Sequence, residues 1–368
     1  MGKKILTINP GSTSTKLGLF DDMEEIFSCN VRHDTAELDK FLTIQEQLPY
    51  RMKTILDEIK LHNIDLGAID AFAARGGLCY PVKSGTYEVN DLLISDLKEG
   101  VQGKHPSNLA GQIALELENK YGGKAFIVNP EVVDEMIDVA RITGIKGVFR
   151  KSLIHALNQK ETCKRCAERI GKPYTQSNFV IAHMGGGFSV SAHKKGEIID
   201  TTDAVNGDGP MTPNRAGDIP ATAMIDLCFS GEYTKKEMYE LISKKGGLVD
   251  HFGTDSAMAV AEMVDDGDEY AILIYNAMIH QVGKYIGAYA TVLHGDVDRI
   301  ILTGGLANDK KIVEKISEMV KYIAPIEVYP GEFELEALAS GALSVLRGEE
   351  TARTYTGKPD CTESSTQK

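Results

Sequence analysis

The sequence contains no apolar run of the length that a bilayer requires. A transmembrane helix needs roughly 18 consecutive apolar residues, and no such run occurs among the 368 residues. The N-terminal stretch MGKKILTINPGS also lacks a long apolar segment followed by a small-residue cleavage site. We therefore expect neither a membrane protein nor a secretory signal.

Cysteine and positive charge are also scarce. Six scattered cysteines are too few for a disulfide scaffold, which predicts a reducing, cytoplasmic location. Cys163 and Cys166 form a CxxC in a helical pattern with no second pair, and we interpret them as two thiols on one helical face. The net charge of −13 argues against nucleic acid as a partner, because nucleic acid binding needs a basic surface. A local cluster of Arg and Lys can still bind an anionic substrate.

Two common nucleotide-binding motifs are absent as well. The sequence has no GxxxxGK[ST], so it is not a P-loop protein, and it has no GxGxxG after a strand, which disfavours a dinucleotide-binding fold. Its content of 42% hydrophobic and 25% charged residues is ordinary for a globular protein. The chain is long enough for two cores.

An internal repeat indicates the plan of the fold. KILTINPGSTSTKLGLFDDMEEIFS, near the N-terminus, and NFVIAHMGGGFSVSAHKKGEIIDTT, at 178–202, share one pattern. Each consists, in order, of an apolar strand, a turn of small residues, a strand with alternating polar positions, a second turn and a third strand. We therefore predict two similar α/β domains that face each other across a cleft. The expected domains are 1–150 and 151–350, with a last helix at about 333–347 that could pack on the first domain, and a flexible tail at 351–368.

The first turn of each hairpin has the chemistry of a phosphate-binding site. Small residues let backbone N–H groups approach a ligand closely, and Ser and Thr hydroxyls add donors. If the chain from Ser12 onward is a strand, its period of two places Ser12, Ser14 and Lys16 on one face. A solvated hairpin rich in β-forming residues is the alternative for one hairpin alone. Two such hairpins in opposition would hold a polyphosphate from both sides.

Four motifs, in order along the chain, resemble one family. They are TINPGSTSTKLGLF, AHMGGGFSVSAH, GDGPMTPNRAG and ILTGGLA. Together they closely resemble the butyrate kinases, in the acetate kinase branch of the sugar kinase/heat-shock chaperone/actin superfamily, from Lys3 to about Glu350. The resemblance implies two ribonuclease H-like domains of the actin-like ATPase type. It also implies ATP-dependent phosphorylation of butyrate with Mg²⁺, and a homo-oligomer.

The resemblance also assigns a nucleotide and metal site. Glu334, in PGEFELEAL, matches the acetate kinase carboxylate that acts through magnesium, although a Glu in such a helix is more often on a solvated face. Asn9 and Glu334 are therefore the expected metal ligands. The expected phosphate ligands are Asn9, Ser12, Ser14 and Lys16 in the first hairpin and Gly185, Gly186 and Gly187 in the second, and the expected adenosine ligands are Gly304, Gly305 and Ala307.

The acyl acceptor would need cations more than a base. A short-chain carboxylate has a pKa of roughly 4 to 5 and is already ionised at neutral pH, so the difficulty is to bring it against an anionic phosphate. Arg75 follows the apolar run AIDAFAA and matches the arginine that binds the carboxylate in acetate kinase. Arg215, in TPNRAGDIP, matches the one that stabilises the phosphoryl group in transfer. A surface ion pair is the alternative for either arginine alone.

Histidines and one amide complete the expected catalytic set. His155, on a predicted helix, and His183, in the second hairpin, match active-site histidines, and His105 is a weaker match; a single helical His is more often structural. The relatives carry a catalytic or metal-linked aspartate where this chain has Asn129, before a helical pattern that begins near Glu131. Asn cannot act as a base and is a poorer ligand for hydrated Mg²⁺. A carboxylate kinase tolerates that change better than a sugar kinase, and a non-catalytic ATP-binding module is the other alternative.

Overall fold

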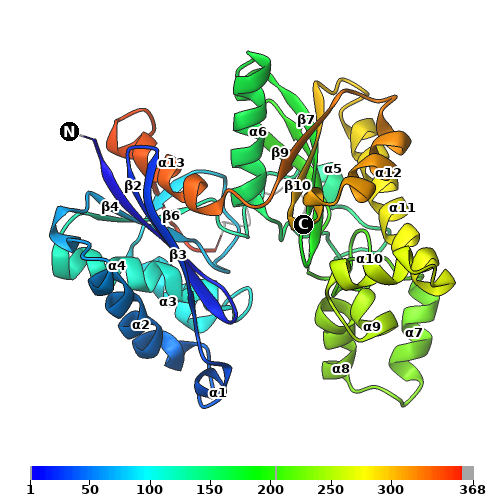
Figure 1. Ribbon diagram of the computed structural model, residues 1–368, viewed down its shortest axis with the longest axis horizontal. Helices are drawn as coiled ribbons and strands as arrows, with labels where there is room; N and C mark the ends of the chain where they lie inside the picture. The colour runs from blue at the N-terminus through cyan, green and yellow to red at the C-terminus, as the bar shows by residue number, and fades with distance from the viewer. Residues whose placement is uncertain (1, 204, 359–368) are drawn as a thin grey trace. The chain divides into compact units, whose positions relative to one another are not determined.

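The computed structural model describes residues 2–203 and 205–358, whose helices and strands are drawn in Figure 1. They form two compact units, one made of 2–134 with 333–358 and the other of 135–332. The second unit thus begins before the boundary at 150 that the sequence suggested. Arg150 explains the difference, because its guanidinium bonds to Asp200 at 2.8 Å and to Asp208 at 2.9 Å and so ties the preceding segment to the second unit.

A seven-stranded sheet forms the centre of the first unit, in the order β12-β5-β6-β4-β1-β2-β3. Its first three strands are an antiparallel meander, and β4 and β6 are parallel to β1. The central strands are buried on both faces, so they read as continuous apolar runs. The strands are β1 (Lys4–Pro10), β2 (Ser14–Asp21), β3 (Glu24–Arg32), β4 (Ala71–Arg75), β5 (Thr86–Glu88), β6 (Lys124–Val128) and β12 (Arg353–Thr354).

Helices cover both faces of this sheet. α4 packs on β1, β4 and β6, and α13 packs on the same three strands and on β2; Figure 1 shows them on opposite faces. α13 is the last helix of the chain, so one face of the first sheet is covered by a segment that follows the whole second unit. The helices are α1 (Thr35–Leu38), α2 (Leu48–Leu61), α3 (Asp91–Glu99), α4 (Ala110–Tyr121) and α13 (Glu334–Leu346).

The segment after α13 is not the flexible tail that the sequence suggested. β12 pairs with β5, and Tyr355 is buried. The Tyr355 hydroxyl donates to Asp96 at 2.7 Å and accepts from the N–H of Tyr80 at 3.1 Å. These contacts fix the chain to the first unit as far as Tyr355, and the last part of the expected tail, 359–368, lies outside the described residues.

The second unit repeats the topology of the first. Its sheet has the order β11-β10-β7-β8-β9, with an antiparallel meander followed by two parallel strands. The second strand of each meander even has its irregularity at the same place, after Leu19 in β2 and after Ala192 in β8. The predicted fold class is therefore confirmed. The strands are β7 (Asn178–Met184), β8 (Phe188–Lys194), β9 (Glu197–Thr201), β10 (Arg299–Gly304) and β11 (Ile326–Pro330).

Helices also cover both faces of the second sheet. α6 packs on β7 and β10, whereas α11 packs on β7, β8 and β9. Cys163 and Cys166 of α6 are buried against Phe179 and Ile301, and burial raises the pKa of Cys166 to about 11, so the CxxC is part of the core. The helices are α5 (Asp138–Arg141), α6 (Ala156–Ile170), α7 (Ala221–Phe229), α8 (Lys235–Glu240), α9 (Leu248–Phe252), α10 (Ala257–Asp265), α11 (Glu269–Val292) and α12 (Lys310–Val320).

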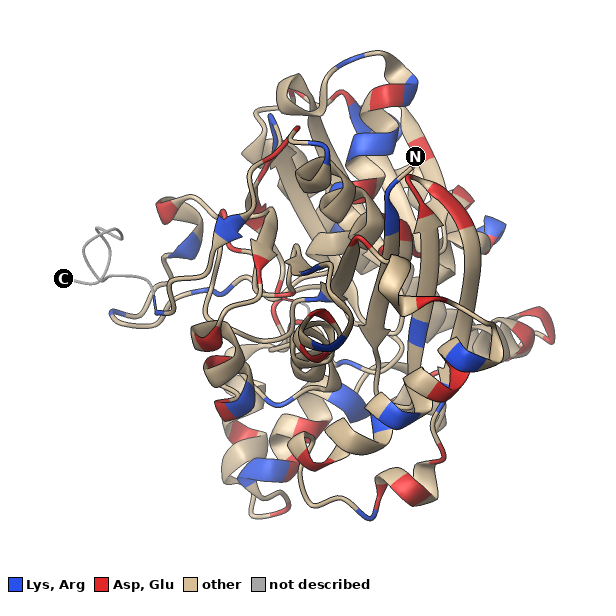
Figure 2. Ribbon diagram, turned by 90° about the vertical axis from the view of Figure 1, so that its left-hand side faces the viewer, with Lys and Arg blue, Asp and Glu red and all other residues tan. Residues whose placement is uncertain are grey.

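Charged residues of both signs are distributed along the described part of the chain. Figure 2 shows Lys and Arg segments interspersed with Asp and Glu segments on the ribbon. No helix in the described ranges has both the length and the apolar character of a membrane span.

Candidate active site

In the first unit, the ends of three parallel strands bring four polar residues together. Arg75 is the last residue of β4; its Nε donates to Glu131 Oε1 at 2.7 Å, and its Nη1 donates to Glu334 Oε1 at 2.8 Å and Asn9 Oδ1 at 3.4 Å. The Asn9 amide donates to the other oxygen of Glu334 at 2.5 Å. Asn9 and Glu334 are buried. The structure therefore brings three of the predicted site residues into one hydrogen-bonded cluster.

Glu131, the fourth member, was not predicted from the sequence. The helix that was expected to begin here does not form, because Asn129 has a left-handed φ of 39°, Pro130 follows, and Val133 pairs with Val82 instead. Burial by itself would raise the pKa of the Glu131 carboxyl group, but the charges of Arg75 and then His105 outweigh it and the pKa is lowered. The sequence signal for Glu131 is only its place beside two valines in PEVVDE, because a carboxylate buried with apolar neighbours needs a partner.

Asn129 has a structural contact rather than a place in this cluster. Its Oδ1 accepts from the Gly85 N–H at 2.8 Å, and its own N–H donates to the Gly85 carbonyl at 3.0 Å. The side chain thus ties the end of β6 to the loop before β5. The catalytic role expected of Asn129 stays a prediction, and the carboxylate that the structure places beside Arg75 belongs to Glu131.

The predicted phosphate ligands of the first hairpin lie partly on strand β2 and partly in the turn before it. β2 begins only at Ser14, because the N–H of Gly11 donates to the Ser14 carbonyl at 2.7 Å and closes a turn. Ser14 and Lys16 are half-buried on one face of β2, but Ser12 is exposed in the turn. The expectation that Ser12 shares their strand face is therefore wrong. His105 caps the short helix that follows it, because its Nδ1 accepts from the N–H of Ser107 at 3.2 Å; the same atom lies 2.8 Å from Ser107 Oγ.

In the second unit, the two predicted histidines lie against each other. The rings of His155 and His183 stack with centroids 4.0 Å apart and an interplanar angle of 10°. The Asn158 amide donates to His183 Nδ1 at 2.8 Å, so the proton of a neutral His183 is on Nε2. His155 is the residue before α6 rather than a residue within the helix, and its Nδ1 lies 2.9 Å from Ser189 Oγ. Sequence reasoning missed Asn158 and Ser189, which orient the two rings.

Arg215 lies against the glycine turn between β7 and β8. A Cβ on Gly187 would lie 2.0 Å from Arg215 Nη1, so the guanidinium occupies the space that a side chain would need. Burial lowers the pKa of Arg215, and the nearby Asp203 opposes that shift. Gly185 and Gly186 face His183 Nε2 and Asn214 Nδ2, each 3.4 Å from an added Cβ. The second turn is thus a small-residue cradle with cationic and amide groups around it.

The LTGGLA motif forms the end of β10 and the short 3-10 helix that follows. Gly304 has a φ of 90°, and a Cβ there would lie 2.4 Å from the Met184 carbonyl oxygen. Gly305 faces open space, with nothing within 4 Å of an added Cβ, and Ala307 is buried. Gly304 therefore serves the close approach of two strands, whereas Gly305 leaves room for a ligand.

These two glycines give a matched pair of predictions. Gly304→Ala should lower the melting temperature by several degrees, because the added methyl collides with backbone at a left-handed φ. Gly305→Ala should leave the melting temperature unchanged and raise the KM for ATP. Thermal unfolding and steady-state kinetics measure both effects. An unchanged KM in Gly305→Ala would remove that residue from the nucleotide site.

The donor set of the first unit fits a magnesium ion, and the turns fit a nucleotide. Asn9 and Glu334 lie within hydrogen-bond distance of each other and offer oxygens as metal ligands. The described part of the chain contains no group of three or more His, Cys, Asp or Glu that is suited to a metal. Mg²⁺ usually takes one or two carboxylates and completes its shell with phosphate oxygens and water. The open space at Gly305 would admit a nucleotide to the backbone, and the turn at 185–187 has no side chain of its own to keep a phosphate from its N–H groups.

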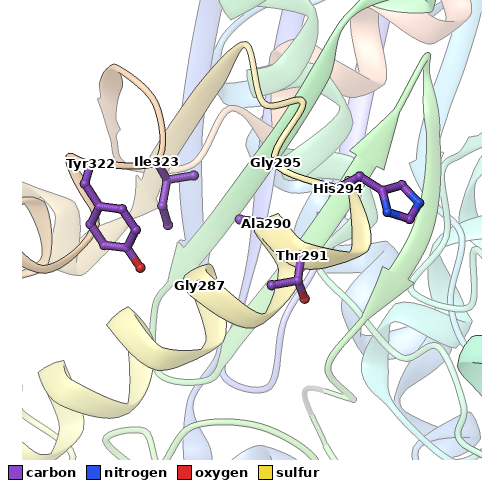
Figure 3. Close-up of a pocket in the computed structure, with 7 residues that line it drawn as sticks. All are labelled: Gly287, Ala290, Thr291, His294, Gly295, Tyr322 and Ile323. Carbon is purple, nitrogen blue, oxygen red and sulfur yellow. The ribbon is translucent and has the colours of Figure 1, made fainter.

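A surface pocket on the second unit lies apart from these residues. It is lined by the end of α11 and the segment after α12, and Figure 3 shows His294 and Tyr322 at its opposite ends. Small and aliphatic side chains form the rest of its wall. None of the predicted site residues lines it, so we assign it no chemistry. Its lining residues are Gly287, Ala290, Thr291, His294, Gly295, Tyr322 and Ile323.

Comparison with known proteins agrees with this geometry. A model of the acetokinase family matches residues 127–335, more than half of the chain. The chain belongs to the acetokinase family. Three solved structures share the fold of this acetokinase: an acetate kinase from Porphyromonas gingivalis (21% identity, TM-score 0.74, 94% of this chain and 100% of that one), a propionate kinase from Francisella tularensis (17%, 0.73, 92% and 98%) and an acetate kinase from Entamoeba histolytica (16%, 0.73, 92% and 98%).

Membership of the acetokinase family gives the coarse activity. The family is one of kinases, which are phosphotransferases that use ATP, and a carboxylate is their acceptor. The likeness to the three structures shows the actin-like ATPase fold in both halves of this acetokinase.

Proposed function

We propose that the chain is a butyrate kinase of the cytoplasm, which converts butyrate and ATP to butyryl phosphate and ADP. The observation that carries the proposal is the cluster at the end of β4, where Arg75 lies between Glu131 and Glu334 beside Asn9. Such a site places a guanidinium at the end of β4, and the acceptor needs no base because it is already ionised. By resemblance to the butyrate kinases, the residues of the four motifs and the short segment from Pro210 to Arg215 favour butyrate over acetate as the acid.

In the proposed mechanism, positively charged side chains of the protein compensate the negative charges of the carboxylate and of the phosphoryl group. Arg75 binds the acyl carboxylate by hydrogen bonds from its guanidinium, and Arg215 stabilises the phosphoryl group during in-line transfer. His183 donates from Nε2, and its stacked neighbour His155 is held by Ser189. A magnesium ion, held by Asn9 and Glu334, would neutralise phosphate charge.

Acyl phosphate formation tests this proposal. Purified protein would receive Mg-ATP with acetate, propionate, butyrate or isobutyrate, and the product would be trapped with hydroxylamine. We expect the highest kcat/KM with butyrate. An optimum at propionate or isobutyrate would change the substrate but keep the class. No product from any acid, with ATP still bound, would favour a non-catalytic ATP-binding module.

We also propose that the protein forms a homo-oligomer through α7. The helix has the sequence ATAMIDLCF, yet none of its nine residues is buried, and Ile225 and Phe229 are 55% and 87% exposed. An apolar helix with no buried face is typical of a surface that another subunit covers. A second copy of this chain supplies an equally apolar face, which is the arrangement of a two-fold dimer.

Light scattering after size exclusion checks the oligomer. Phe229→Glu should shift the molar mass to that of a monomer, because a charge within an apolar interface remains without a partner. Leu42→Glu is the matched control, since Leu42 is 93% exposed on another part of the chain and should leave the mass unchanged. A monomeric wild-type protein would refute the proposal.

A further inference from the structure

A fully buried arginine stands behind the first phosphate turn. Arg51 of α2 has no exposed surface, and none of the described carboxylates pairs with it. Its Nη1 donates to the Gly11 carbonyl at 2.9 Å, and its Nη2 donates to the Ser12 carbonyl at 2.8 Å. Its Nε donates to Gln47 Oε1 at 3.0 Å. Burial lowers its pKa to about 10, so it remains a cation at neutral pH.

His33 also forms hydrogen bonds with the same turn. The N–H of His33 donates to the Thr13 carbonyl at 2.9 Å, and its Nε2 lies 2.8 Å from Thr15 Oγ1. Burial, together with the charge of Arg51, lowers the pKa of His33 to about 4, so its ring is neutral. The carbonyls of residues 11, 12 and 13 are therefore all fixed from behind.

The geometry of the trans peptide bond determines where the N–H groups that follow these carbonyls point. No peptide bond in the described residues is cis, and in a trans peptide the C=O and the following N–H point in opposite directions. Because Arg51 holds the carbonyls of Gly11 and Ser12, the N–H groups of Ser12 and Thr13 point away from it. No group in the described part of the chain accepts from these two N–H groups, and both residues are exposed.

We propose that Arg51 is a positioning residue that holds the turn at 11–14 as a binding site for the terminal phosphate of the nucleotide. Successive outward N–H groups form a concave anion site, and the buried cation behind them adds positive potential that no described carboxylate cancels. Arg51 acts through the turn and does not touch the phosphate. This inference rests on the proposed function, because it takes the turn to be the phosphate side of the kinase site.

The test compares Arg51→Met and Arg51→Lys with Lys53→Met. Arg51→Met removes both the hydrogen bonds and the charge, and it should lower kcat by about a hundredfold with the KM for the acid changed less than about threefold. Arg51→Lys keeps the charge without the fork of donors and should lose about tenfold. Lys53 is exposed on the same helix, so Lys53→Met removes one charge and should leave kcat unchanged. An Arg51→Met enzyme with wild-type kcat would overturn the inference.

Hydrogen exchange on the wild-type protein gives a readout that needs neither turnover nor a variant that folds. The amides of Ser12 and Thr13 should exchange fast in the free protein, and a β,γ-imido analogue of ATP with Mg²⁺ should slow them. ADP, which lacks the terminal phosphate, should not. Equal exchange with and without the analogue would overturn the inference. A wild-type protein that makes no acyl phosphate but shows this protection would overturn only the proposed function.

Discussion

Arg215→Ala should lower kcat by at least about a hundredfold, which is the usual cost of removing one donor that stabilises charge in a transition state. The KM for the carboxylate should change little, because the interaction forms during transfer rather than on binding. The guanidinium lies directly on the second glycine turn, at the place of a missing Cβ of Gly187. Steady-state kinetics with varied acid and varied ATP would measure both parameters, and near-normal turnover would rule out a role in the transition state.

Gly187→Ala tests the same role without removing the charge. The new methyl would lie 2.0 Å from Nη1, and the far end of a flexible side chain can move, so the fold should persist while the guanidinium is displaced. We expect a fall in kcat in the same direction as for Arg215→Ala. Gly287→Ala is the matched control, because an added Cβ there has nothing within 4 Å and lies on α11. Equal kcat in both glycine variants would contradict the assigned position of Arg215.

Arg75→Ala should raise the KM for the carboxylate at least about tenfold and leave the KM for ATP nearly unchanged, since an ion-paired hydrogen bond is worth more than about 1.4 kcal/mol. The reason is the position of Arg75 at the end of β4, where its guanidinium is the cation of the cluster. Kinetics with each substrate varied in turn would separate the two constants. An equal loss for both substrates would remove the role in binding the acid.

The same variant should also lose stability. Without Arg75, the carboxylates of Glu131 and Glu334 remain close together and poorly solvated, at a cost of about 3 kcal/mol. Glu131→Gln in the Arg75→Ala background should restore part of the melting temperature. A double variant less stable than Arg75→Ala would show that the two carboxylates do not repel.

The pH dependence of stability follows from the sign of the Glu131 shift. In the wild type its pKa is lowered on folding, so its contribution is present above the unfolded pKa and is lost as the pH falls through the folded one. Arg75→Ala removes the largest of the interactions that lower the pKa, while burial still raises it and His105 still lowers it. The variant should therefore lose less stability than the wild type on mild acidification.

The hairpins, the central strands and the repeat could be predicted because each depends on a local pattern of apolar residues and turns. The cluster around Arg75 could be predicted only in part. Arg75 and Glu334 are 259 positions apart, and the resemblance assigned both to one active site without predicting their contact. Glu131 was missed because a left-handed Asn129 redirects the chain, which no periodicity records. Arg51 looks like an ordinary residue of an amphipathic helix, and only its carbonyl partners reveal its role.

The return of α13 to the first sheet has a consequence during protein synthesis. A ribosome releases β1, β4 and β6 long before it reaches residue 334. One face of the first sheet therefore lacks its covering helix, α13, while the second unit is synthesised. The Arg75 cluster gains Glu334 only when α13 emerges. A chain that terminates at 332 would therefore lack both the cover of the first sheet and one carboxylate of its site.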